Sequence, residues 1–118
     1  MRVLIVMTNP ARRATESALA QLGVEAVSAA NAGEAAHALD VAPDALVTQV
    51  ALADGNWRDV IDAVFGRWGP MPVAVCSSIA GAERDVLAED VRRSGGFALF
   101  DMPAAMEQLR DLLGSAEH

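Results

Sequence analysis

The chain has 118 residues, with no lysine, no tyrosine and one cysteine, Cys76. A single cysteine excludes an internal disulfide and any zinc site built on paired thiolates. No glycine-rich nucleotide-binding pattern follows the first predicted strand, and no G-x-S-x-G turn is present. The two histidines, His37 and His118, belong to no recognisable catalytic arrangement. We therefore expect no enzyme activity.

Positive charge is also scarce. The nine basic residues are all arginines, scattered singly or in pairs along the chain. The sixteen acidic residues outnumber them, which gives a formal net charge of −7. Nucleic-acid binding needs a clustered basic face, so we expect none. The apolar runs are far shorter than the roughly 20 residues that cross a bilayer, and the N-terminus has no signal-peptide pattern. These features predict a cytoplasmic protein that does not bind membranes.

What is present is an alternation of short apolar runs with helical patterns. Hydrophobic residues make up 53% of the chain, enough for one domain over residues 1–118. We predict strands at residues 2–7, 24–28, 44–50, 73–77 and 97–101. Helices are predicted at 11–23, 32–43, 57–68, 82–96 and 104–114. Because short right-handed crossovers join parallel strands, the pattern predicts an α/β fold with helices on both faces of a parallel sheet.

The third predicted helix has the clearest pattern. Asn56 precedes it as a candidate cap. Apolar residues then follow at helical spacing, which indicates a core-facing side: Trp57, Val60, Ile61, Val64, Phe65 and Trp68. Six large apolar residues are many for one helix, and we expect Trp68, near the end of the helix, to be partly exposed.

Ligands of open parallel sheets bind outside the carboxyl ends of the strands. Here the ends of the first, third, fourth and fifth strands carry one carboxylate and neither histidine nor lysine: Met7, Thr8, Gln49, Ser77, Ser78, Asp101 and Met102. This is a poor set for catalysis. Gln49 alone has two interpretations, a hydrogen-bonded amide at a strand end or the remnant of a dismantled site.

Four segments resemble the sequence blocks of the receiver domain of bacterial two-component response regulators: "VLIVMTNP", "PDALVTQVALADG", "PVAVCSS" and "GGFALFDMP". Pro43, Pro72 and Pro103 also fall where that family has prolines. Asp54 and Gly55 resemble the family's Asp-Gly turn, although they follow Gln49 more closely than usual. The resemblance covers essentially the whole chain and implies a flavodoxin-like (βα)5 sheet with strand order 2-1-3-4-5.

The positions that carry phosphorylation in that family hold other residues here. The resemblance places Met7 and Thr8 at the magnesium-binding acidic pair, Gln49 at the phospho-accepting aspartate and Met102 at the lysine. Only Ser77, at the Thr/Ser position, keeps its type. Met7 and Thr8 cannot replace carboxylates around a hard cation, and an amide cannot form an acyl phosphate. The resemblance thus implies a degenerate pocket with no metal and no cofactor.

Three other side chains are candidates for chemistry: Asp54, Asp101 and Cys76. Asp54 and Asp101 would lack magnesium ligands and a lysine as substitute acceptors, so we interpret Asp54 as a turn residue. Cys76 lies in an apolar strand, where a free cysteine usually behaves as a small hydrophobe.

Our leading hypothesis is a pseudo-receiver, which acts in signal transduction by binding a protein partner without phosphorylation. The resemblance places its partner surface, or a homodimer interface, on the fourth helix, the fifth strand and the fifth helix. Arg92 and Arg93 are the proposed anchors there, and Leu99 stands at the family's switch aromatic. The alternative to an interface is that the charged side chains of the fourth helix are simply exposed to solvent.

The alternative hypothesis is a small-molecule sensor. In it, the degenerate pocket lined by Met7, Gln49, Ser77 and Met102 holds a ligand. A pocket of a few hundred Å³ at the strand ends would favour this function, whereas filling of the space by side chains would disfavour it. A divergent enzyme is the third and weakest hypothesis.

Overall fold

The computed structural model describes residues 1–117, so His118 lies outside the described residues. Five parallel strands form the main sheet: β1 (Arg2–Val6), β2 (Glu25–Ala29), β3 (Ala45–Gln49), β6 (Val73–Cys76) and β7 (Ala98–Phe100). Their order is β2-β1-β3-β6-β7. Since β6 and β7 are the fourth and fifth strands of this sheet, the predicted order 2-1-3-4-5 is confirmed.

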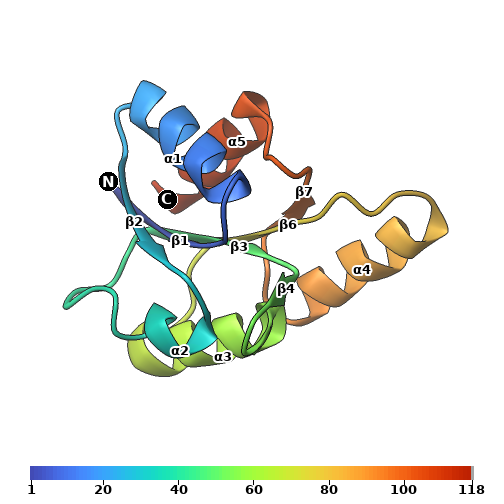
Figure 1. Cartoon of the computed structure of the whole chain (residues 1–118), viewed down its shortest axis with the longest axis horizontal. Coiled ribbons are helices and arrows are strands. Elements are labelled where there is room, and N and C mark those ends of the chain that lie inside the picture. Colours follow the sequence, from blue (N-terminus) through green and yellow to red (C-terminus); the bar gives the residue numbers. More distant parts are fainter. Residues whose placement is uncertain (118) are drawn as a thin grey trace.

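Helices cover both faces of the sheet (Figure 1). One face carries α1 (Ala11–Gln21) and α5 (Met106–Ala116), and the other carries α2 (Ala32–Ala35), α3 (Trp57–Trp68) and α4 (Ala82–Arg93). Within residues 1–117, no helix is both long and apolar enough to cross a membrane.

Alternation along the strands builds a separate core on each face. In β1, Val3 and Ile5 join the core beneath α1 and α5, whereas Leu4 and Val6 join the core that contains α3 residues. All four side chains are fully buried. Burial on both faces explains why the central strands are continuous apolar runs.

Helix α3 forms as predicted. The Asn56 side-chain oxygen accepts a hydrogen bond from the Arg58 N–H at 2.9 Å, and the Asp59 carboxylate accepts one from the Asn56 N–H at 2.9 Å. This reciprocal capping box fixes the start of the helix. Trp68 is half-buried, as the sequence pattern predicts. Four apolar residues of the helix are buried: Trp57, Val60, Ile61 and Val64.

The predicted helix over residues 32–43 is wrong in its extent, because α2 ends after one turn. The His37 N–H donates to the Glu34 carbonyl, a tight i to i−3 bond that closes the turn. By Asp44 the chain is already hydrogen-bonded to β1, through the Arg2 carbonyl. Alanine favours helices strongly, but intrinsic propensity amounts to a fraction of a kcal/mol per residue, and the return of the chain to the sheet overrides it.

A hairpin follows β3 where the sequence indicated only a turn. Strands β4 (Ala51–Leu52) and β5 (Gly55–Asn56) pair antiparallel around residues 53–54. A Cβ at position 55 would collide with the carboxylate of Asp59, so a larger residue there would displace this capping side chain. The hairpin places Asn56 at the start of α3 and carries Asp54 towards α2.

Candidate functional site

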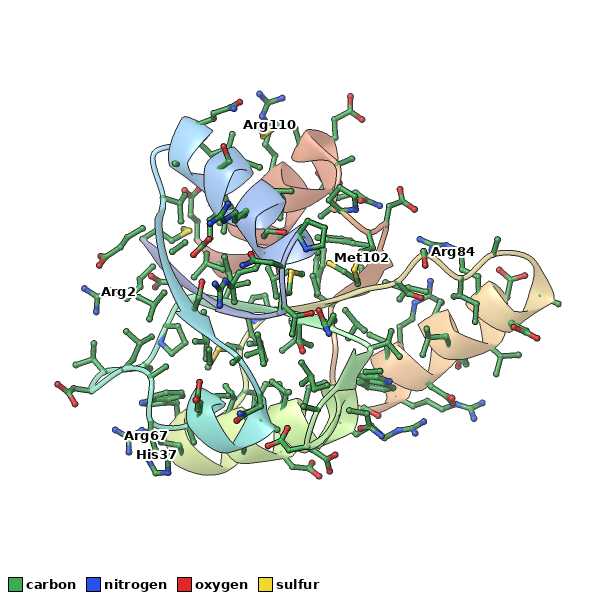
Figure 2. All side chains as sticks on the ribbon, in the orientation of Figure 1. Arg2, His37, Arg67, Arg84, Met102 and Arg110 are labelled. Carbon is green, nitrogen blue, oxygen red and sulfur yellow. The ribbon has the colours of Figure 1, made fainter. Side chains whose placement is uncertain are left out.

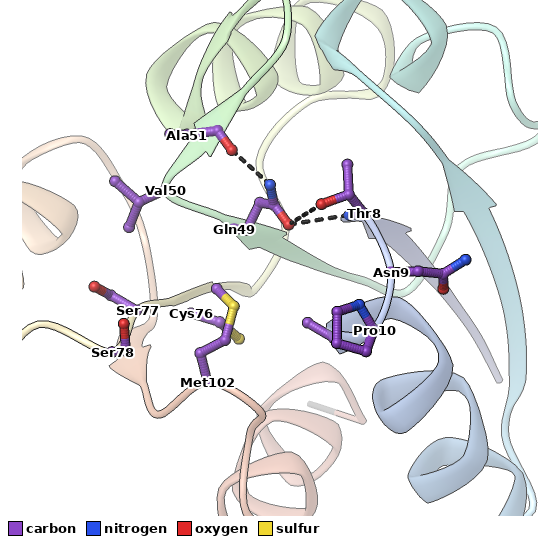
Figure 3. Close-up of a pocket in the computed structure, with 11 residues that line it drawn as sticks. Thr8, Asn9, Pro10, Gln49, Val50, Ala51, Cys76, Ser77, Ser78 and Met102 are labelled. Atoms are coloured by element: carbon purple, nitrogen blue, oxygen red, sulfur yellow. Dashed lines mark hydrogen bonds between the residues drawn. The ribbon is translucent and has the colours of Figure 1, made fainter.

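A pocket of about 340 Å³ opens at the carboxyl ends of the strands (Figure 3). Its lining comes from residues 8–11 after β1, residues 49–51 from the last residue of β3 onward, residues 76–78 from the last residue of β6 onward, and Met102 after β7. The strand register brings these ends to one level, since Gln49 pairs with Cys76 and Cys76 pairs with Phe100. The pocket lies where an open parallel sheet places its ligands.

Four of the five residues predicted for this pocket do line it: Thr8, Gln49, Ser77 and Met102. Met7 does not, and that prediction is wrong. It is fully buried on the same side as Val3 and Ile5, in the core with α1 and α5. Its sulfur lies 3.4 Å from the Thr15 hydroxyl, whose single proton also has the Ala11 carbonyl within reach at 2.9 Å. Strand alternation continues through residue 7 and turns this side chain into the core.

Gln49 ties two loops together (Figure 3). Its side-chain oxygen accepts from the Thr8 N–H at 3.0 Å and from the Thr8 hydroxyl at 3.3 Å. Its amide nitrogen donates to the Ala51 carbonyl. Gln49 is thus a hydrogen-bonded amide at the end of a strand, a geometry that both interpretations of the sequence share. The amide holds the loop after β1 against the loop after β3.

The residues that line the pocket are all uncharged. Its polar side chains are hydroxyls, amides and a thiol: Thr8, Asn9, Gln49, Cys76, Ser77 and Ser78. Magnesium prefers carboxylate and water oxygens in octahedral geometry, so this donor set does not fit that ion. Throughout residues 1–117, no group of three or more His, Cys, Asp and Glu side chains gathers as a metal site would require.

Arg84 fixes one rim of the site, a role that was not predicted from the sequence. From the first turn of α4 it donates to the carbonyls of Ser77 at 3.4 Å and Ile79 at 3.2 Å. It also pairs with the Asp101 carboxylate at 3.2 Å. Arg84 thus joins the loop after β6 to the end of β7. The pair with Asp101 joins residues far apart in the chain, so no local pattern predicts it.

Asp54 is a turn residue, as interpreted from the sequence. Its two carboxylate oxygens accept from the N–H groups of Ala32 at 3.0 Å and Gly33 at 2.9 Å. The hydrogen bonds from Gly33 and Ala32 lower the pKa of Asp54 below its usual value. The carboxylate therefore holds the β4–β5 hairpin to α2, away from the strand-end pocket.

Cys76 has the properties of a buried, unreactive thiol. Its side chain is fully buried. Burial, with a smaller contribution from the Asp101 charge, raises the pKa of the thiol to about 12. The reactive thiolate is accordingly almost absent at neutral pH.

The residues predicted for the interaction surface lie on α4 and β7. Arg92 and Arg93 are exposed, and both pair with Glu89, at 3.7 and 3.3 Å. Leu99 is half-buried and packs against the core on the α3 face. Leu99 therefore offers only part of its side chain to a partner. Other arginines lie far apart around the molecule, including Arg2, Arg67 and Arg110 (Figure 2).

Solved receiver-domain structures superpose on this chain over nearly its whole length. A candidate response regulator from Chloroflexus aurantiacus matches with a TM-score of 0.85 and 18% identity, over 99% of this chain and 98% of that one. The chain has the fold of a receiver domain. No protein-family model matches the sequence, and no curated protein is detectably similar to it.

Two further receiver-domain structures match this chain, one with a bound metal ion and one that is a dimer. The receiver domain of a sensor histidine kinase from Pseudomonas aeruginosa holds a magnesium ion in its active-site cleft. It matches with a TM-score of 0.81 and 17% identity, over 99% of this chain and 98% of that one. The beryllofluoride-activated NtrC4 receiver domain is a dimer. It matches with a TM-score of 0.82 and 19% identity, over 98% and 96% of the two chains.

Proposed function

We propose that this chain is a pseudo-receiver, a domain with the receiver fold that acts in signal transduction by binding a protein partner, without phosphorylation. The uncharged lining of the strand-end pocket carries this proposal. Phosphoryl transfer depends on metal ions and cationic side chains that neutralise charge on the transferred group. In this chain no carboxylate and no cation lines the pocket where those groups would have to stand.

The hydrogen bonds of Gln49 support the same function. A phospho-accepting residue must present a free nucleophilic oxygen to the pocket, whereas the Gln49 amide is bound at both ends to its own chain. These bonds give the residue a structural role in the loops around the pocket. The sequence resemblance and the shared fold are thus accounted for by a retained scaffold with altered chemistry.

The partner surface we propose comprises α4, β7 and α5, with Arg92, Arg93 and Leu99 as its interaction residues. Helix α4 supports this choice because Val91 is its only buried residue. The NtrC4 receiver dimer is a precedent for association of this fold, so a homodimer is one form that the interaction can take. Interfaces concentrate their energy in a few anchors, among which arginine is enriched.

Reversing the charges of Arg92 and Arg93 to glutamate tests the surface. We expect this double variant to lose self-association in sedimentation experiments or capture of a partner from the source organism's lysate. The matched control is Arg2→Glu with Arg13→Glu. It makes the same charge change on β1 and α1, outside the proposed surface, and also disrupts an exposed pair, Arg2 with Glu25. Equal associations in wild type and both variants would show that the surface is wrongly placed.

A second candidate function is the sensing of a small molecule, and one observation favours it. The pocket of about 340 Å³ falls within the usual range of ligand sites, roughly 300–1,000 Å³. Side chains at the strand ends therefore leave room for a ligand. The two functions are compatible, because a bound molecule can alter the loops that lead to the partner surface.

A further inference from the structure

An apolar groove adjoins the strand-end pocket. Its volume is about 320 Å³, and it runs between the start of α1 and the segment after β7. Its lining residues are Pro10, Ala11, Ala14, Met102 and Pro103. Three of them, Pro10, Ala11 and Met102, also line the strand-end pocket. The two cavities therefore lie side by side and share part of their wall.

The two cavities differ in polarity. The groove is lined only by carbon-rich side chains and one thioether. The strand-end pocket offers hydroxyls, among them the buried Ser77, whose oxygen accepts from the Ile79 N–H at 3.0 Å. The Ser77 hydroxyl donates to none of the residues that the structure describes, so its proton is available to a ligand. Ser78, beside it, is exposed.

Charge restricts what this site can hold. Both cavities are lined entirely by uncharged residues. An anionic ligand would find no cation in the lining, and the Arg84 guanidinium at the rim is paired with the Asp101 carboxylate. The protein around the site carries a net charge of −7. A cationic ligand would find no carboxylate in the lining. Moving a charge into such surroundings without a partner is costly, so the site selects an uncharged molecule.

We propose that the strand-end pocket and the groove together bind an uncharged amphipathic small molecule. A carbonyl or hydroxyl group of the ligand accepts the Ser77 proton, and its apolar body crosses Met102 to lie against Ala14 and Pro103. Methionine suits the junction because its flexible, polarizable side chain adapts to irregular apolar shapes. This inference rests on the second candidate function and assigns the class of ligand to it.

Two fluorescent probes of opposite character test the ligand class. Nile red is uncharged, with a carbonyl at one end of a flat apolar body, whereas 1-anilinonaphthalene-8-sulfonate is an anion. We expect Nile red to bind the wild-type protein saturably, with one molecule per chain, and the anionic probe to bind at least about tenfold more weakly. Equal affinity for the two probes would overturn the assignment of an uncharged ligand but leave the sensing function standing.

Matched variants on α1 test the location. Ala14→Glu puts a carboxylate on the groove wall and should weaken Nile red binding about tenfold or more. Ala20→Glu makes the same change at an exposed position of α1 that lines neither cavity, and should leave binding unchanged. Urea midpoints show that both variants are folded. Equal affinities for the two variants would place the probe elsewhere and overturn the proposal.

Substitutions at the junction test how the two cavities are joined. Met102→Leu keeps an apolar side chain and should retain Nile red binding, whereas Met102→Lys should weaken it and strengthen binding of the anionic probe. The absence of saturable binding by either probe to the wild type would overturn both this inference and the sensing function. Identical probe affinities for Met102→Leu and Met102→Lys would show that the ligand does not cross Met102.

Discussion

Removing the Gln49 amide should destabilise the domain measurably. Gln49→Ala deletes two hydrogen bonds to Thr8 and one to Ala51. A hydrogen bond between neutral groups contributes about 0.5–1.5 kcal/mol net. Gln49 is half-buried beside an open pocket, so water replaces part of what is lost. We therefore expect a loss of about 1–2 kcal/mol in the free energy of unfolding.

Urea denaturation at pH 7 measures this loss. With a slope of about 1.5 kcal/mol per molar urea, the midpoint should fall by about 1 M. Gln21→Ala is the matched control, because Gln21 is exposed at the end of α1, and its midpoint should move by less than about 0.3 M. Gln49→Met keeps the side-chain length without the hydrogen bonds. If it is as stable as the wild type, the bonds do not carry the stabilisation and the reasoning is refuted.

Three further predictions concern Asp54, Cys76 and the core. The pKa of Asp54 is lower in the folded state than its unfolded value of 3.8. The charged carboxylate therefore stabilises the fold fully at pH values above the unfolded pKa, and this stabilisation is lost as the pH falls through the folded pKa. The stability difference between wild type and Asp54→Asn should therefore be constant from pH 7 to about 5 and shrink below about 3.8; a difference undiminished at pH 2.5 would exclude the carboxylate as its source. With a thiol pKa of about 12, roughly one Cys76 in 10⁴ is ionised at pH 8, so a thiol-specific disulfide reagent should label it only in denaturant; rapid labelling of the folded protein would contradict this. Ile61→Ala, on the buried face of α3, should lower the free energy of unfolding by about 2–4 kcal/mol, whereas Val86→Ala, on the exposed side of α4, should lower it by less than about 0.5 kcal/mol. Similar urea midpoints for the two variants would contradict the assignment of the core.

The sheet was predictable from the sequence because its pattern is local and repeated. Strands buried on both faces are continuous apolar runs, and α3 shows both its cap at Asn56 and its apolar spacing. The extent of α2 was not predictable in this way. Its alanines favour a helix, but the chain turns at His37 to return to the sheet, which depends on contacts distant in sequence.

The candidate site was predictable in position but not in detail. Strand ends gather at one edge, so Thr8, Gln49, Ser77 and Met102 could be placed together from their positions alone. Met7 was misplaced because the resemblance aligns it with a pocket residue by position, whereas strand alternation puts its side chain with those of Val3 and Ile5 in the core. The bridge from Arg84 depends on how α4 packs beside β7, and no sequence spacing encodes it.

The central claim is that the chemistry of phosphorylation is absent from this pocket as a whole, beyond the loss of one aspartate. Loss of a single preorganised electrostatic contact costs a factor of about 10² to 10³ in rate, and here both the metal ligands and a lining cation are missing. The most direct test restores the nucleophile alone, as Gln49→Asp. The variant is incubated with acetyl phosphate and magnesium and its intact mass is measured beside that of a receiver domain known to be phosphorylated under the same conditions. We predict that the control gains a phosphoryl group and that Gln49→Asp does not; appreciable phosphorylation at residue 49 would contradict the account.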